Sequence, residues 1–179
     1  MKLERVPPRA SRTHVHVLID TPAGSANKYK LDEEYGLFRV SRRLPEGMIF
    51  PHNFGSIPGT RAADGDLLDV LVLGLAPAFP GCLVTARLVG VLQASQIESG
   101  KPVRNDRLIG VGETPVNRSA VRHISELPVR QLADIENFFR AYNAAQGREF
   151  SISGRSGPRA AEAALRRAIR EFERGQSGD

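Results

Sequence analysis

Apolar residues along this chain fall mostly in short runs separated by polar stretches that are rich in glycine and proline. Runs of this length, with alternation or with β-branched and aliphatic residues, predict strands at 14–19, 28–31, 37–42, 70–73, 83–92, 108–111 and 150–153. The short polar connection between the second and third of these predicts an antiparallel hairpin. The proline- and glycine-punctuated stretch 51–60 and the polar stretch 93–106 are predicted to be loops.

The periodicity changes in the C-terminal third of the chain. Apolar residues recur there at helical spacing between Pro128 and Gly147, namely Leu132, Ile135, Phe138, Phe139 and Tyr142. This spacing predicts a helix over 127–146. A second amphipathic helix is predicted from Pro158 to about Phe172. Short strands followed by helices indicate an α+β fold with a small closed or partly closed barrel.

The overall composition sets limits on the class of protein. The chain has 179 residues, which suits one domain; we expect a flexible N-terminal arm over 1–12 and a single domain over 13–175. No apolar run is long enough to cross a membrane. The single cysteine, Cys82, and the lack of an apolar leader fit a cytoplasmic protein. The net charge of +5 permits polyphosphate or nucleic-acid partners, but aromatic residues do not interleave with the basic ones, so nucleic acid is disfavoured.

The stretch from Asp64 to Leu73 concentrates the candidate chemistry. Asp64, Asp66 and Asp69 lie within six positions and lead into a buried strand. In a continuous strand Asp64 and Asp66 would share a face and Asp69 would point to the other, so they converge only if the chain bends at Gly65. Converging carboxylates repel one another unless a hard cation neutralises them. Spacing alone favours a solvated turn ahead of a core strand, so the metal interpretation depends on the rest of the chain.

Several motifs along the chain, taken together, resemble the soluble family I inorganic pyrophosphatases. The most specific is Asp64-Gly65-Asp66-Leu67-Leu68-Asp69-Val70-Leu71-Val72, which is similar to the family's Asp-Gly-Asp-Pro-x-Asp-Val-Leu-Val signature. Collinear support comes from 17–22, 28–29, 50–55, 80–81, 89–92 and 138–142, so the likeness runs from about Val15 to about Phe172. The resemblance implies an OB-like five-stranded mixed or antiparallel barrel with flanking helices, hydrolysis of pyrophosphate, and Mg²⁺ or another divalent cation such as Mn²⁺. It also implies a homo-oligomer, a hexamer or a trimer.

The resemblance assigns roles residue by residue. Asp66 would be the catalytic base that deprotonates the attacking water. Metal ligands would be Asp64, Asp69, Asp20 and Asn105. Residues that bind pyrophosphate or phosphate would be Lys28, Lys30, Arg42, Phe54, Arg107 and Tyr142. Positive side chains and metal ions suit this chemistry because the substrate and its transition state carry several negative charges.

The chain departs from the family pattern at the site itself. Lys30 stands where a glutamate is expected, Gln96 and Asn105 where aspartates are expected, Phe50 and Phe54 for tyrosines, Asn143 for a lysine and Leu67 for the proline. These changes make the site more positive, and fewer carboxylates should hold fewer divalent ions. Alternatives to pyrophosphate hydrolysis are a non-catalytic relative that binds a phosphorylated ligand or a protein, hydrolysis of a different phosphoanhydride, and an OB-like nucleic-acid binder.

Overall fold

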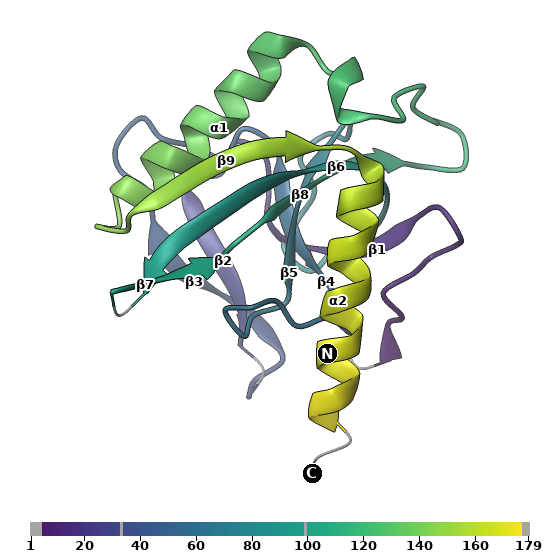
Figure 1. Cartoon of the computed structure of the whole chain (residues 1–179), viewed down its shortest axis with the longest axis horizontal. Helices are drawn as coiled ribbons and strands as arrows, with labels where there is room; N and C mark the ends of the chain where they lie inside the picture. Colours follow the sequence, from purple (N-terminus) through teal and green to yellow (C-terminus); the bar gives the residue numbers. More distant parts are fainter. Residues whose placement is uncertain (1–4, 33, 99, 177–179) are drawn as a thin grey trace.

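The chain folds around a closed ring of five strands, seen at the centre of the computed structural model in Figure 1. The structure describes residues 5–32, 34–98 and 100–176. The ring strands are β1 (Val15–Thr21), β4 (Asn53–Ile57), β5 (Leu68–Leu73), β8 (Arg107–Glu113) and β6 (Leu83–Glu98). They pair in the order β1-β4-β5-β8-β6, and β6 closes the ring on β1. Only the β5–β8 pair of this ring is parallel, so the expected mixed five-stranded barrel is confirmed.

Shorter strands extend or flank the ring. They are β2 (Asn27–Asp32), β3 (Leu37–Arg43), β7 (Lys101–Arg104) and β9 (Phe150–Ser156). β2 and β3 form the predicted antiparallel hairpin as a separate sheet. β7 and β9 both pair with β6. The prediction of a loop over 93–106 was therefore wrong. β6 continues through that stretch and returns as β7, because partners on both sides satisfy its backbone although its side chains are polar.

The prediction of a loop over 51–60 was also wrong, because β4 lies within it. All five residues of β4 are buried, and its two polar residues, Asn53 and Ser56, do not alternate with apolar ones, so the sequence shows no strand periodicity. Gly55 is needed for its close contact with β1, since a Cβ there would lie 2.1 Å from the carbonyl oxygen of Leu18. A glycine inside a strand often marks such a close backbone approach.

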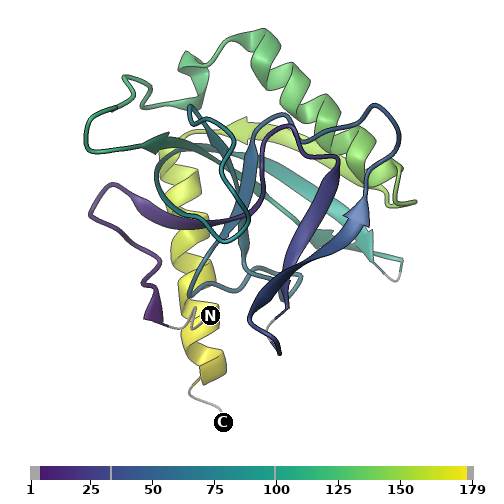
Figure 2. The ribbon, with the colours of Figure 1, turned by 180° about the vertical axis from the view of Figure 1, so that it is seen from behind.

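Two helices pack on the barrel from different sides, as Figures 1 and 2 show. α1 (Val129–Ala144) follows the short helix η2 (Ile124–Glu126) and crosses one end, while α2 (Pro158–Gln176) runs down the side. Both predicted helices are confirmed. α2 places Ala161, Ala164, Leu165 and Ala168 on a core cluster to which all five ring strands contribute. Small alanine side chains let this helix approach the strands closely.

The alternation along β5 separates two core clusters and fixes where a site can lie. Leu68, Val70 and Val72 pack in the cluster under α2. Leu71 and Leu73 point to the other face and pack in the cluster under α1, with Ile135 and Phe139 of that helix. Because side chains alternate along a strand, Asp69 must lie on the face shared with α1.

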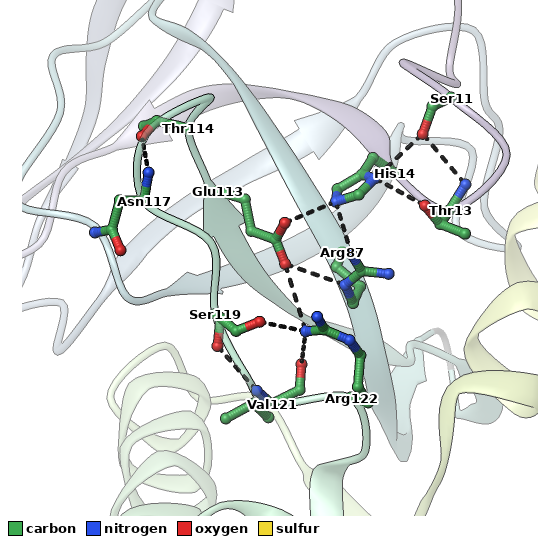
Figure 3. A network of polar contacts seen from close by, with 10 residues as sticks. All are labelled: Ser11, Thr13, His14, Arg87, Glu113, Thr114, Asn117, Ser119, Val121 and Arg122. Carbon is green, nitrogen blue, oxygen red and sulfur yellow. Dashed lines mark hydrogen bonds and ion pairs between the residues drawn. The ribbon is translucent and has the colours of Figure 1, made fainter.

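A polar network joins the segment before β1 to β6 and β8 (Figure 3). Glu113, at the end of β8, accepts a hydrogen bond from Arg87 Nε at 3.1 Å, and His14 Nε2 lies 3.0 Å from its other oxygen. Arg122 approaches the same carboxylate at 3.7 Å. His14 thus contacts both a carboxylate and an arginine in this network.

The segment that precedes β1 lies against the barrel where the structure describes it. The backbone N–H of His16 donates to the Pro8 carbonyl at 3.1 Å, and Arg9 forms a β-bridge with Val15 and an ion pair with Glu162 of α2. The boundary expected between residues 12 and 13 stays a prediction. Among the described helices, none has the length and apolar character required to cross a bilayer.

Candidate functional site

The candidate site lies on the α1-side face of the ring, where charged residues occupy neighbouring strands. The register between β1 and β4 shifts between Ile19 and Thr21, so Asp20 sits at an irregularity. Such bulges re-aim a side chain. Ser56 of β4 pairs in register with Asp69 of β5 and with Leu18 of β1, and its side chain lies close enough to the Asp20 carboxyl to lower the pKa of Asp20. Asp20, Ser56 and Asp69 therefore form one row across three strands.

Arg107 extends this row onto the fourth strand. β5 and β8 pair with Val70 opposite Leu108, so the preceding residues, Asp69 and Arg107, begin side by side. Arg107 Nη1 lies 2.7 Å from Asp69 Oδ2, within hydrogen-bonding distance for a charged pair. The same nitrogen donates to Asn105 Oδ1. The predicted phosphate-binding arginine is thus paired with a predicted metal ligand.

The β2–β3 hairpin supplies the cations that face this row. Lys28 and Arg42 are directly paired across it, and a register irregularity follows Lys28. The Lys28 ammonium lies 4.2 Å from the ring centroid of Phe54 and 5.7 Å from that of Phe50, which are cation–π distances. Phe54, a predicted substrate-binding residue, is buried and therefore acts as support for Lys28.

Aromatic rings form a continuous support beneath these cations, which we call the aromatic floor. It consists of Phe50, Phe54, Phe138, Phe139, Tyr142 and Phe150, whose neighbouring centroids lie 5.1 to 6.5 Å apart. The Arg107 guanidinium carbon lies 5.8 Å from the centroids of both Phe139 and Phe150. Lys28 and Arg107 therefore stand on the same floor.

Tyr142 joins the floor to the exposed part of the hairpin. It stacks on Phe138 with a centroid distance of 5.7 Å, and it lines an open hollow of about 380 Å³ together with Arg42, Arg43 and Gln146. The predicted phosphate ligands Arg42 and Tyr142 therefore line the same hollow. Arg42 is exposed, so its guanidinium is accessible to a ligand from solvent.

The turn before β5 carries the other two aspartates. Gly65 has φ +86°, a left-handed conformation that glycine adopts readily, and this is the bend expected between Asp64 and Asp66. The backbone N–H of Asp66 donates to Asp64 Oδ1 at 3.3 Å. Asp66 points towards the hairpin, where Lys30 Nζ lies 3.2 Å from its Oδ1, and these side chains are 67 % and 65 % exposed. The pair is weak because water screens it.

The ionisable groups of the site influence one another. Burial raises the pKa of the Asp20 carboxyl to about 7; the charge of Lys28 opposes the rise and that of Asp69 adds to it. Burial also raises the pKa of Asp64, and the charges of Asp69 and Asp66 raise it further. Burial lowers the pKa of Lys28, against the attraction of Asp20 and Asp69. Burial is therefore the main cost of charging Asp20 and Asp64, and the neighbouring charge of Asp69 adds to it.

Partly buried carboxyls whose charged form is disfavoured suit a cation, which would stabilise that form. Within the described ranges, no group of three or more His, Cys, Asp or Glu side chains is assembled closely enough to hold a metal ion. Arg107 and Lys30 instead partner Asp69 and Asp66. The carboxylate chemistry thus fits a hard divalent cation, provided that the aspartates draw together around it.

Gln96 on β6 and Asn105 before β8, which stand where the family pattern has aspartates, are both buried. Gln96 lies within β6, paired with Val103 of β7. Asn105 donates its backbone N–H to the Ala94 carbonyl at 2.9 Å, while its side-chain oxygen holds Arg107. The Asn105 side-chain oxygen thus accepts from Arg107 and keeps a second lone pair for another partner.

Sequence analysis missed three residues that build the site. Ser56 lies in the stretch predicted to be a loop, so its pairing with Asp69 was not expected. Phe139 and Phe150 were assigned to a helix core and to a strand, without a link to Arg107. Their helical or strand spacing signalled burial but contained no sign of which cation they contact.

The closed ring of strands with α1 and α2 packed on it defines an α+β protein with an OB-like barrel. Residues 17–173 match the family described as inorganic pyrophosphatase. An inorganic pyrophosphatase of Geobacillus stearothermophilus is 37% identical over 158 residues, which cover 88% of this chain and 93% of that protein. One from Synechocystis is 36% identical over 154 residues, covering 86% and 89%.

A solved structure agrees with these sequence matches. The crystal structure of inorganic pyrophosphatase from Thermus thermophilus superposes with a TM-score of 0.86 at 30% identity, covering 97% of this chain and 99% of that one. The chain therefore belongs to the inorganic pyrophosphatase family, as its motifs suggested.

Proposed function

We propose that this protein hydrolyses inorganic pyrophosphate to two phosphates. The observation that carries the proposal is the row of Asp20, Asp69 and Arg107 across neighbouring strands, opposite Lys28 on the aromatic floor. Facing carboxylates and cations suit a substrate that enters as a complex of a polyanion with a divalent cation. Membership of the family supports the same reaction.

The reaction needs a base for water and cations for the phosphates. Water attacks one phosphorus, its proton passes to the Asp66 carboxylate, and the bond from that phosphorus to the bridging oxygen breaks. The electron pair goes to the leaving phosphate. Asp66 is accessible for this role because its pair with Lys30 is exposed. Lys28, Arg42, Arg107 and Tyr142 are the proposed partners of the phosphate oxygens.

The proposed cofactor is Mg²⁺, with Mn²⁺ as a substitute. When bound, the ion supplies positive charge to the phosphate oxygens and favours deprotonation of water. Asp20, Asp64 and Asp69 are the proposed ligands, and Asn105, whose side-chain oxygen also accepts from Arg107, is the fourth. The raised pKa of Asp20 and Asp64 supports this assignment, since burial is its main cause and a bound cation would stabilise the charged form of these carboxyls.

The decisive variant is Asp66→Asn, which keeps the shape of the side chain and removes the base. We expect phosphate release from magnesium pyrophosphate to fall by about 10²–10⁴-fold. Stability should be unchanged, because Asp66 is mostly exposed. The matched control is Asp134→Asn, an exposed aspartate on α1. Equal activity in wild type and Asp66→Asn would refute the assignment.

The assembly and location proposed here follow from the family and the sequence. We propose a homo-oligomer, a hexamer or a trimer, that uses the exposed side of α1. Val129 at the start of this helix is 77% exposed, which supports a covered position in an assembly. A cytoplasmic location is proposed because Cys82 is the single cysteine.

A further inference from the structure

Arg107 is predicted to bind phosphate, yet its side chain is largely buried and already paired with a carboxylate. Its side chain is 9% exposed and its Nη1 contacts Asp69 Oδ2 at 2.7 Å, with the Asp69 side chain 25% exposed. The parallel register of β5 and β8 brings these residues together without any help from a loop. The ion pair is thus part of the sheet itself.

Contacts other than Asp69 keep the guanidinium in place. Asn105 Oδ1 accepts from Nη1, and Phe139 and Phe150 flank the group. Arg107 Nε is buried and has no hydrogen-bond partner among the described residues. The guanidinium therefore has one charged partner within salt-bridge distance in that part of the chain, Asp69. A partly desolvated pair of this kind resists separation, since either charge left alone would be costly.

This pair changes what the carboxylates offer to a metal ion. Asp69 is the aspartate that couples electrostatically to both Asp20 and Asp64. A divalent cation that used Asp69 Oδ2 would have to displace a guanidinium held by Asn105 and two rings. Since affinity for hard cations follows the number of available carboxylate charges, the pair lowers the capacity of the site.

We propose that Arg107 is a resident counterion of Asp69, positioned by Asn105, and that it takes the place of one divalent cation in the carboxylate set. The inference rests on the proposed function only in taking the aspartates as the cation site. The chain would then bind fewer divalent ions than its carboxylates could otherwise hold, and Arg107 would remain on Asp69 when the remaining ions bind.

Binding of Mn²⁺ without pyrophosphate tests this directly, by isothermal titration and by electron paramagnetic resonance of the free ion. In Arg107→Met the apolar stem remains on the rings and the charge is lost. We expect one additional Mn²⁺ per chain, or at least about tenfold tighter binding, a change of about 1.4 kcal/mol. Arg107→Lys, which keeps the charge, should bind the wild-type number of ions.

The matched control is Arg104→Met. Arg104 forms its own ion pair with Asp106 at 2.6 Å, two residues from Asp106 and three from Arg107 along the chain. Its loss removes the same charge nearby and leaves the Arg107–Asp69 pair in place; the carboxyl that it frees, Asp106, is buried and does not act on Asp20 or Asp64, so Mn²⁺ binding should stay within about twofold of wild type. An equal gain in Arg104→Met and Arg107→Met would overturn the proposal, as would no gain in Arg107→Met.

Two further measurements test the proposal even if Arg107→Met does not fold. Asn105→Ala removes the positioning contact and should tighten Mn²⁺ binding about threefold or more. In the wild type, the ¹⁵N–H signal of Arg107 Nε should stay protected from solvent exchange at saturating Mg²⁺. Loss of that protection would show that the metal ion displaces Arg107, and the proposal would fall.

These outcomes separate the inference from the proposed reaction. The predicted Mn²⁺ pattern without any phosphate release would leave the resident counterion intact and remove the hydrolase. Normal phosphate release by the wild type, together with unchanged Mn²⁺ binding in Arg107→Met, would support the hydrolase and remove the resident counterion.

Discussion

At the scale of single residues, the contribution of an ion pair to the stability of the fold depends on how far its side chains are exposed to water. Glu113 has a side chain only 5% exposed, and burial alone would raise its pKa. Hydrogen bonds from Arg87 and His14 outweigh burial and hold the pKa of Glu113 below its ordinary value of 4.5. The exposed Lys30–Asp66 pair has no such protection from solvent. We therefore expect the Glu113 network to stabilise the fold far more than that pair does.

This difference predicts a pH-dependent effect of Glu113→Gln. A lowered carboxyl pKa stabilises the folded state above pH 4.5, and the stabilisation is lost as pH falls through the folded value. We expect the variant to be about 1–3 kcal/mol less stable at pH 7, because Arg87 keeps a buried charge without its partner. The difference should shrink as pH falls below 4.5, as measured by urea denaturation at several pH values.

The control is Glu171→Gln, which removes the exposed pair with Arg174 on α2. It should change stability by less than about 0.5 kcal/mol at any pH. A Glu113→Gln effect that stayed constant from pH 7 to pH 3 would contradict the assignment of the network as charged.

At the scale of elements, the contact between β1 and β4 decides whether Asp20 meets the rest of the site. β4 carries Ser56 between Asp20 and Asp69, and Gly55 lets β4 approach β1. A side chain at position 55 would collide with the Leu18 carbonyl, which is backbone and cannot rotate away. The ring and the row of carboxylates therefore depend on the same glycine.

The corresponding prediction is that Gly55→Ala destabilises the protein by about 3 kcal/mol or more, because a strand must shift. Thermal unfolding measures it. Gly154→Ala is the control: in β9, a Cβ would meet Gln93 Oε1 at 3.4 Å, an ordinary contact. Comparable melting temperatures for the two variants would show that the strands have room at Gly55.

The elements that sequence predicted well are those with one buried face or a short aliphatic run. β5 and both helices fall in this group, and the turn at Gly65 was expected because Asp64, Gly65 and Asp66 form a distinctive signal. β4 and the β6–β7 extension were missed, since full burial removes alternation and a polar strand resembles a loop. The pairing of Arg107 with Asp69 could not be predicted, because it depends on the register between distant strands.

At the scale of the whole molecule, the two helices differ in what they leave exposed. α2 turns its alanine- and leucine-bearing face to the core. α1 buries Leu132, Ile135 and Phe139, while Val129 stays in solvent. An apolar side chain this exposed at a helix start suits a contact between copies of the chain.

The prediction at this scale concerns Val129→Lys. If copies associate through α1, light scattering of the wild type should give a mass that is a multiple of 19.6 kDa, and the variant should shift towards the monomer. Val40→Lys, on the exposed face of β3, is the control that should leave the mass unchanged. A wild type that remains at 19.6 kDa at every concentration would contradict the expected oligomer.

The parallel pairing of β5 with β8 also has a consequence for the order of folding. The whole of β6 lies between these strands along the chain, so Asp69 and Arg107 meet only through a long-range contact. Contacts of this kind form slowly, because the chain loses the entropy of closing a long loop before the contact contributes any stability. Early intermediates would therefore carry their aspartates without the guanidinium, and they could capture ions that the native protein later rejects. Refolding rates in the presence and absence of Mn²⁺ would report that competition.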